Sequence, residues 1–117
     1  MASILKSLRV LSESVRLRLM LLLVEEELMV AELQEILGLA QSRISTQLAQ
    51  LKGEDLVSDR RVGKNIFYSA AEDLGPAALA VLEAARGELK EAAEDKARLG
   101  FTLRKRKDKA AEYFNRL

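Results

Sequence analysis

Apolar residues recur at helical spacing in the first part of the chain. Residues 3–11 place four of them on one face of a helix: Ile4, Leu5, Leu8 and Leu11. The next run, from Val15 to Leu23, is apolar on nearly every side, which is typical of a helix at the centre of a domain. Ser12 or Ser14 can cap this second helix, because a side-chain oxygen there can accept from a free backbone N–H.

Two shorter helical patterns follow, and a glycine separates them. The first has apolar residues spaced by three and four: Val30, Leu33, Ile36 and Leu37. Gly38 is suited to end it, because helices often close on a residue with a positive φ. The second pattern covers residues 41–52 and ends at Gly53. Two short helices joined by a tight turn with glycine predict a helix-turn-helix.

After Gly53 the pattern changes from helix to strand. The segments "LVSDRRV" and "NIFYSA" flank Gly63 and Lys64, which predicts a two-stranded hairpin. The only proline, Pro76, suits the first turn of a following helix, where its missing N–H has no bond to lose. We expect that helix to cover residues 77–99, with Gly87 weakening it without ending it.

The order of these elements predicts a mainly α protein of the α+β type. It is a winged helix-turn-helix of about five helices, with a two-stranded β-hairpin as the wing. We assign residues 1–99 to this domain. Residues 100–117 form a basic C-terminal segment, because the composition shifts at Gly100 and five of the six residues from Arg104 to Lys109 are basic.

Composition excludes several classes of site. The 117 residues suit one domain, and the net charge of +1 means that any basic site must be local. The chain has no cysteine and no histidine, so disulfides, the usual zinc sites and the commonest nucleophile–base pairs are absent. It also lacks a glycine-rich cofactor loop. We therefore predict no catalytic residue, no metal and no cofactor.

The most apolar run does not predict a membrane span. "LRLMLLLV", residues 17–24, contains Arg18 and is followed at once by three glutamates. A span needs about 20 apolar residues, so a buried helix is the better interpretation. No secretory signal is evident, and we expect a cytoplasmic protein without a membrane partner.

Residues 41–52 predict a helix with one apolar and one small, polar side. Ile44, Leu48 and Leu51 form the apolar side. The remaining surface carries six candidate DNA-binding residues: Gln41, Ser42, Arg43, Ser45, Thr46 and Gln47. Glutamine can pair with adenine and arginine with guanine, so this surface suits the major groove of double-stranded DNA. The alternative is a solvated helix face, although such faces usually carry acids and none occurs here before Glu54.

The hairpin adds three basic candidates beside this helix. Arg60, Arg61 and Lys64 surround Gly63 at the expected wing tip. Asp59 is the only acid from residue 57 to residue 69, so the local charge is +3 − 1 = +2. A basic wing next to a recognition helix can reach phosphates or the minor groove. A charged turn alone is usually just solvated, so its position after the helix-turn-helix carries the interpretation.

These motifs resemble the ArsR/SmtB winged-helix transcriptional repressors. The resemblance covers roughly residues 5 to 70 and is most specific from Glu32 to Tyr68, with "AEL", "LGL", "QSRIS", "RRVG" and "FY" at the family's spacing. It implies a sequence-specific repressor that binds an inverted repeat as a homodimer. It also implies a dimer interface built from residues 3–11 and 77–99: Ile4, Leu5, Leu8, Leu11, Leu79, Leu82 and Leu89. The alternative is that both helices pack only within the monomer.

The chain departs from the family pattern at several positions. Ala40 stands where members often have a capping serine, so the recognition helix is expected to start nearer Ser42. Gln47 stands where many members have histidine, which leaves the base preference open. Met29 and Ala31 stand in the segment that carries metal-binding cysteines in the best-known members. Those metal-sensing sites are therefore absent, and the effector is unknown.

The tail "RKDKAAEYFNRL" resembles the junction in proteins that fuse such a repressor to an S-adenosylmethionine-dependent methyltransferase. If so, the chain is a regulatory or dimerising module of a longer enzyme and is itself not an enzyme. A basic terminal helix that assists DNA binding is the alternative interpretation of the tail. A third hypothesis is a winged helix that has lost DNA binding and serves protein contacts.

Overall fold

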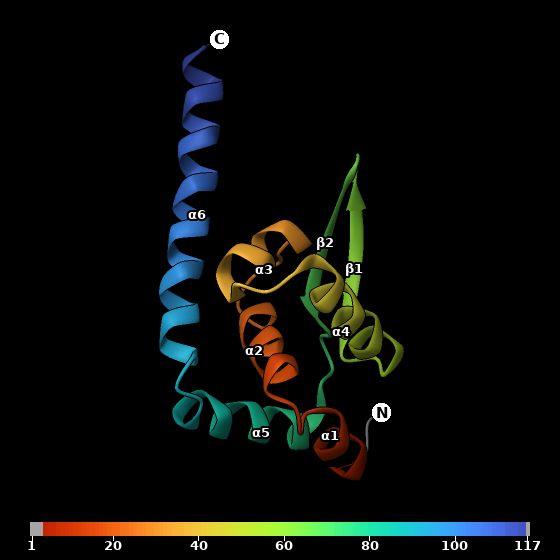
Figure 1. Cartoon of the computed structure of the whole chain (residues 1–117). Coiled ribbons are helices and arrows are strands. Elements are labelled where there is room, and N and C mark those ends of the chain that lie inside the picture. Colours follow the sequence, from red (N-terminus) through yellow and green to blue (C-terminus); the bar gives the residue numbers. More distant parts are fainter. Residues whose placement is uncertain (1–3, 117) are drawn as a thin grey trace.

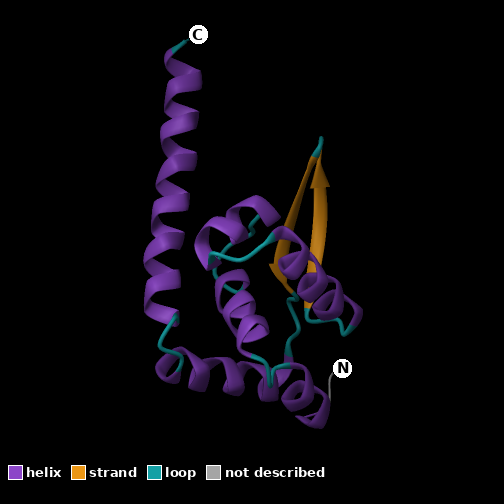
Figure 2. Cartoon of the chain, in the orientation of Figure 1, coloured by secondary structure: helices purple, strands orange, loops and turns teal. Residues whose placement is uncertain are grey.

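The computed structural model describes residues 4–116. Its elements in chain order are α1 (Ile4–Val10), α2 (Ser14–Leu23), α3 (Val30–Leu37), α4 (Gln41–Gly53), β1 (Val57–Val62), β2 (Asn65–Ala70), α5 (Gly75–Glu88) and α6 (Ala92–Asn115) (Figure 1). The predicted mainly α fold with a hairpin wing is confirmed, and Figure 2 shows the two strands projecting from the helices. The described residues form six helices rather than five, because the last predicted helix is divided in two.

Helix α2 lies at the centre of the domain, as its apolar sequence predicts. Leu19 and Met20 are fully buried, and α2 contacts α4, α5, α6 and β2. Burying each such side chain contributes roughly 1.5–3 kcal/mol relative to leaving it in water. The elements that carry polar surface are therefore all positioned against one apolar helix.

The cap of α2 differs from the prediction. Neither Ser12 nor Ser14 caps the helix; the Glu13 carboxylate does, accepting from the N–H of Val15 at 3.0 Å and of Arg16 at 3.2 Å. The Ser12 hydroxyl instead donates to the carbonyl of Arg9 at 2.8 Å. A negative charge at a helix N-terminus is also favoured by the helix dipole, which a serine hydroxyl cannot exploit in the same way.

The turn between α3 and α4 sets the position of the recognition helix. Gly38 ends α3 in the left-handed conformation, with a φ of 68°, as predicted. Helix α4 begins at Gln41 and not at Ser42, although Ala40 offers no side-chain cap. The start is fixed instead by burial of Ile44, whose N–H donates to the carbonyl of Ala40 at 3.2 Å. At the other end, Asp55 adopts a positive φ of 62° where the chain leaves the helix.

The wing is a two-residue hairpin. Its register pairs Val62 with Asn65 across Gly63 and Lys64. Gly63 has a φ of 62°, as the first turn position of a type II′ hairpin requires. At its base, Tyr68 forms an antiparallel bridge with Leu28, each backbone N–H donating to the other's carbonyl at 2.9 Å. This bridge ties the wing to the segment that leads into α3.

The predicted single helix over residues 77–99 is wrong. Helix α5 ends at Glu88, Leu89 is extended with a ψ of 119°, and α6 begins at Ala92. The resulting elbow allows Leu82 of α5 and Leu99 of α6 both to enter the core. Figure 1 shows the consequence, since α5 crosses the foot of the molecule and α6 rises beside α2 and α3. Helix α6 continues through Gly100 without a break, so the composition shift there does not coincide with a helix end.

The cap assignment gives a direct stability test. Replacing Glu13 with alanine removes both cap acceptors and should lower the free energy of unfolding by about 0.5–2 kcal/mol. Ser14→Ala is the matched control and should change it by less than about 0.5 kcal/mol, because Ser14 is an exposed first helical residue. Urea denaturation followed by circular dichroism measures both. A larger loss in the serine variant would reverse the assignment.

Candidate nucleic-acid interface

Helix α4 separates its apolar and polar residues as the sequence predicts. Ile44, Leu48 and Leu51 are buried against the core. Most of the predicted DNA-binding residues of this helix are exposed together on its outer side: Gln41, Ser42, Arg43 and Thr46. Ser45 is half-buried, and the Thr46 hydroxyl donates to the carbonyl of Ser42 at 2.8 Å. The outer side of α4 therefore presents amides, hydroxyls and one guanidinium, with no carboxylate.

Among the described residues, Gln47 is the one predicted residue of α4 that bonds to a side chain on another helix. Its Oε1 accepts from Nε of Arg16 at 2.8 Å, and Oε1 of Gln50 accepts from Nη2 of the same arginine at 3.1 Å. Arg16 projects from α2 and was not predicted as part of this surface. In the sequence, Arg16 is recognisable only as a charged residue at the edge of an apolar helix. This indicates that it has a polar partner but does not identify the partner.

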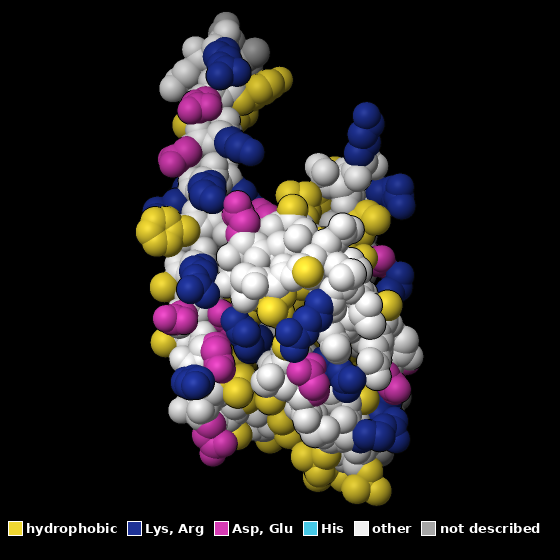
Figure 3. All heavy atoms as spheres, viewed as in Figure 1, with side chains coloured by type: hydrophobic (Ala, Val, Ile, Leu, Met, Phe, Trp, Pro, Cys, Tyr) yellow, Lys and Arg dark blue, Asp and Glu magenta, His cyan; other side chains and the backbone are white. Residues whose placement is uncertain are grey.

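The three basic residues of the wing lie in different environments. Side chains alternate along a strand, so Arg61 shares a face of the hairpin with Asp59, whose carboxylate pairs with Lys52 of α4 at 3.0 Å. Lys64 lies in the turn at the tip. Both are exposed, and neither forms an ion pair within the described part of the chain. In Figure 3, Lys and Arg side chains mark the tip of the hairpin and the neighbouring edge of this face.

Arg60 lies on the opposite face of the wing and already has a partner. Its Nε and Nη2 donate to the two carboxylate oxygens of Glu27 at 2.7 and 2.8 Å, and its guanidinium lies 5.2 Å from the ring centre of Phe67. The hydrogen bond with Arg60 lowers the pKa of Glu27 and raises that of Arg60. The structure thus places Arg60 apart from Arg61 and Lys64, with its charge compensated.

A second arginine connects α6 to the same place. Nε of Arg106 donates to Oε2 of Glu32 at 2.6 Å, and its Nη2 donates to Oε1 of Glu32 and, at 3.0 Å, to the carbonyl of Glu27. Its guanidinium lies 5.9 Å from the ring centre of Phe67. The hydrogen bond with Glu32 raises the pKa of Arg106. Helix α6, helix α3 and the wing therefore share one cluster of charged side chains.

The predicted dimer residues divide into two groups. Ile4, Leu5, Leu8 and Leu79 are exposed by 62%, 75%, 48% and 54%. They lie on α1 and α5, which pack against each other, and hydrophobic side chains gather there at the foot of the molecule in Figure 3. Leu11 and Leu82 are only 2% exposed and Leu89 is half-buried at the elbow. The structure assigns Leu11 and Leu82 to the chain's own core, which corrects their predicted place on a partner-facing surface.

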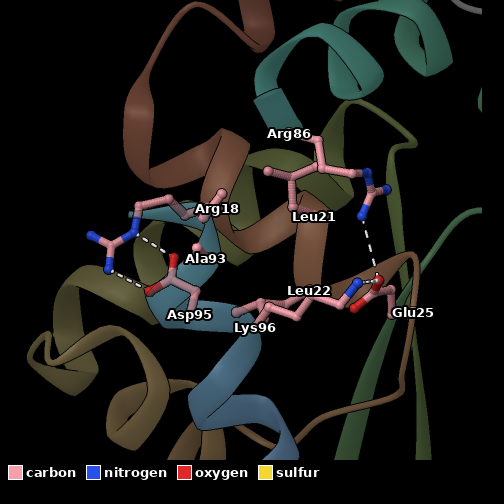
Figure 4. A pocket seen from close by; sticks show the side chains of 9 residues that line it. Arg18, Leu21, Leu22, Glu25, Arg86, Ala93, Asp95 and Lys96 are labelled. Atoms are coloured by element: carbon pink, nitrogen blue, oxygen red, sulfur yellow. Dashed lines mark hydrogen bonds and ion pairs between the residues drawn. The ribbon is translucent and has the colours of Figure 1, made fainter. Parts of the chain in front are cut away.

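Ion pairs hold the elbow against α2. Arg18 donates from Nε and Nη2 to both carboxylate oxygens of Asp95 at 2.8 and 2.9 Å, and this bond raises the pKa of Arg18. Glu25 pairs with Arg86 of α5 at 3.4 Å and with Lys96 of α6 at 3.8 Å. Figure 4 shows these pairs on either side of Leu21 and Leu22. Together these residues line a hollow of about 230 Å³. Helix α5, which carries Leu79, is therefore held by a charge in the segment just after α2, and α6 by a charge on α2 itself.

Residues 4–116 show neither a membrane-spanning helix nor a metal-binding cluster. They contain no helix long and apolar enough to cross a membrane. Nor do they contain a group of three or more acidic side chains that could hold a metal ion.

Comparisons with known proteins agree with this geometry. Residues 13–59 match the family model described as "Bacterial regulatory protein, arsR family". Curated relatives include the transcriptional repressor SmtB homolog of Synechocystis (41% identity over 54% of this chain and 48% of that protein) and the nodulation protein NolR of Rhizobium meliloti (38%, over 63% and 61%). The chain thus spans about half to three-fifths of these relatives.

Solved structures match a larger share of the chain. The transcriptional repressor BigR from Xylella fastidiosa superposes with a TM-score of 0.60 at 37% identity, over 71% of this chain and 79% of that one. Reduced HlyU from Vibrio cholerae superposes with a TM-score of 0.60 at 29% identity, over 71% and 84%. Most of the described fold thus has a counterpart in solved regulators.

The Glu27–Arg60 pair predicts a pH dependence of stability. Because Arg60 lowers the pKa of Glu27 below its ordinary value of 4.5, the pair stabilises the fold above that pH and ceases to do so as Glu27 is protonated below it. Glu27→Gln should therefore lower the melting temperature at neutral pH and leave it nearly unchanged well below pH 4.5. Thermal unfolding across a pH series measures this, with the exposed Glu72→Gln as the charge-matched control. An equal effect of Glu27→Gln at all pH values would contradict the assignment.

Proposed function

The chain belongs to the arsR family of bacterial regulatory proteins and carries the winged helix-turn-helix of a DNA-binding regulator, and we propose from that premise that it acts as a sequence-specific transcriptional repressor. In this proposal it is a homodimer, its target is an inverted repeat in double-stranded DNA, and it acts in the cytoplasm. The chain itself carries out no reaction. Repression follows from occupancy of the operator.

One observation carries the proposal. The outer side of α4, from Gln41 to Gln50, is free of acids and exposes Gln41, Ser42, Arg43, Thr46 and Gln50, and α4 contacts the wing strand β1, which carries the exposed Arg61. A helix in the major groove needs small polar groups that can reach base edges, and a neighbouring wing needs cations that can meet phosphates. A helix face that only contacts water has no reason to lack acidic residues or to lie beside a basic wing.

Exposed apolar residues support the homodimer. Ile4, Leu5, Leu8 and Leu79 form an apolar patch on α1 and α5, on a chain of only 117 residues. A second copy that covers this patch would remove it from water on both subunits. Two-fold symmetry would then present two copies of α4 about one turn of DNA apart, which accounts for an inverted repeat as the target.

The signal that releases DNA is expected to differ from that of metal-sensing relatives. The chain has neither cysteine nor histidine, and Met29 and Ala31 occupy the segment where the family's cysteines stand. Neither side chain can supply a thiolate. We therefore propose an effector other than a metal bound through sulfur or imidazole.

A second candidate function is a regulatory or dimerising module of a methyltransferase. The observation that favours it is the far end of α6, where Tyr113 and Phe114 are 62% and 68% exposed and their rings pack edge to face on each other. Reading the gene beyond the codon for Leu117 tests it. An uninterrupted frame that encodes a glycine-rich cofactor loop would support the fusion, and a stop codon would exclude it.

The wing gives a test of DNA binding. Replacing Arg61 and Lys64 together with alanine should weaken binding to all sequences and flatten the slope of log affinity against log salt by about two per subunit. Arg60→Ala is the matched control and should change the slope less, because Glu27 already compensates its charge. Fluorescence anisotropy with the DNA upstream of the protein's own gene measures both. An unchanged affinity in the double variant would remove the wing from the mechanism.

The apolar patch gives a test of the homodimer. Leu5→Glu, at a side chain 75% exposed, should convert a dimer to a monomer without unfolding it and should weaken operator binding by at least about tenfold. Phe101→Glu, at a side chain 61% exposed on α6, is the control and should leave the dimer intact. Sedimentation equilibrium gives the mass of each. A wild-type protein that sediments as a monomer at all concentrations would exclude the dimer.

A further inference from the structure

The guanidinium of Arg16 binds the side-chain amides of two residues of the recognition helix. Arg16 of α2 donates from Nε to Oε1 of Gln47 and from Nη2 to Oε1 of Gln50, at 2.8 and 3.1 Å. From Nη1 it also donates to the carbonyl of Val10 at 2.9 Å, and Glu13 lies 4.0 Å from its Nε. Arg16 is thus held from α1 and from the start of α2 while it reaches α4. Three of its five N–H donors are therefore engaged within the chain, and the Glu13 carboxylate partly compensates its charge.

The chemistry of arginine fixes which end of each amide faces it. A guanidinium has donors and no acceptor, so the amide group that meets it must be the carbonyl oxygen. The two NH₂ groups of Gln47 and Gln50 then remain, and neither has a partner within residues 4–116. Gln50 is exposed and Gln47 half-buried on the flank of α4, beside the exposed Arg43. Each amide therefore offers donors, with its acceptor engaged by Arg16.

This orientation changes what the glutamines can read. A free glutamine offers one donor and one acceptor, which matches N6 and N7 of adenine. A glutamine whose carbonyl is engaged matches an edge with acceptors: N7 and O6 of guanine, or O4 of thymine. We propose that Arg16 is a positioning residue that makes Gln47 and Gln50 donor-only readers and selects guanine or thymine over adenine where they meet DNA. This inference rests on the proposed DNA-binding function and names the base edge that the surface recognises.

A purely structural role for Arg16 makes a different prediction. The bond to Val10 joins α2 to α1, and the ion pair with Glu13 lies at the start of α2, so their loss would reduce stability and affinity for every sequence alike. Only the orientation of the two amides affects which base is preferred. The base preference at these positions therefore distinguishes the two roles of Arg16, whereas a change in overall affinity does not.

The experiment is selection from a random-sequence pool of DNA duplexes with three full-length proteins. The wild type should select guanine or thymine at the positions that face Gln47 and Gln50. Arg16→Met keeps an apolar stem without donors and should move the preference toward adenine at those positions by about tenfold, with the rest of the site unchanged. Gln47→Glu keeps an acceptor for Arg16 but presents a second acceptor outward, so it should move its position toward cytosine, whose N4 is a donor.

Matched controls separate this inference from its premise. Gln34→Glu adds the same charge on the neighbouring helix α3 and should leave the selected site as in the wild type. If Arg16→Met does not fold by circular dichroism, Gln47→Glu decides alone, because its pair with Arg16 is retained. A wild-type preference for adenine at both positions, or a Gln47→Glu site identical to the wild-type site, would overturn the inference while leaving DNA binding intact. A wild type that enriches no sequence would overturn the proposed function and the inference with it.

Discussion

Burial of α2 is the constraint on which the rest of the structure depends. Leu19 and Met20 lie at its centre with no exposed surface, and the recognition helix, the wing and both C-terminal helices contact it. Two arginines interrupt its apolar sequence, and each leaves the helix in a different direction. Arg16 reaches the glutamines of α4, whereas Arg18 reaches Asp95 of α6. The same helix thus supplies the core and the polar bonds that orient the elements around it.

Local sequence patterns account for most of the fold. The periodicity of Ile44, Leu48 and Leu51 and the glycine at position 38 were sufficient to predict the helix-turn-helix, and the strand-like segments on either side of Gly63 were sufficient to predict the wing. The elbow at Leu89 was not predictable, because the residues there read as continuous helix and only packing against α2 makes the chain turn. The predicted helix boundaries were wrong for a related reason. Glu13 replaces two plausible serine caps, and the start of α4 is set by burial rather than by its cap.

The candidate site was predicted in its residue types but not in its pairings. Arg16 and Gln47 are 31 residues apart in sequence, and Arg60 and Glu27 are 33 residues apart, so no local pattern connects them. Counting cations therefore overstated the charge available to DNA. Arg60 is compensated, whereas Arg61 and Lys64 form no ion pair within the described residues. The net charge of +1 therefore does not distinguish cations that are paired within the fold from cations that are exposed and unpaired within the described residues.

Helix α6 has a mechanical consequence. It is a continuous rod of 24 residues, about 36 Å long at ~1.5 Å per residue, and only its first part is packed against α2 and α3. Two sets of bonds hold it, Arg18–Asp95 near its start and Arg106 to Glu32 and Glu27 past its midpoint. A tilt of about 10° at the elbow would carry the far end through roughly 6 Å and Arg106 through roughly 4 Å, given that rise per residue. The second displacement is larger than a hydrogen bond tolerates, so a movement of the far end is coupled to the bonds of Arg106.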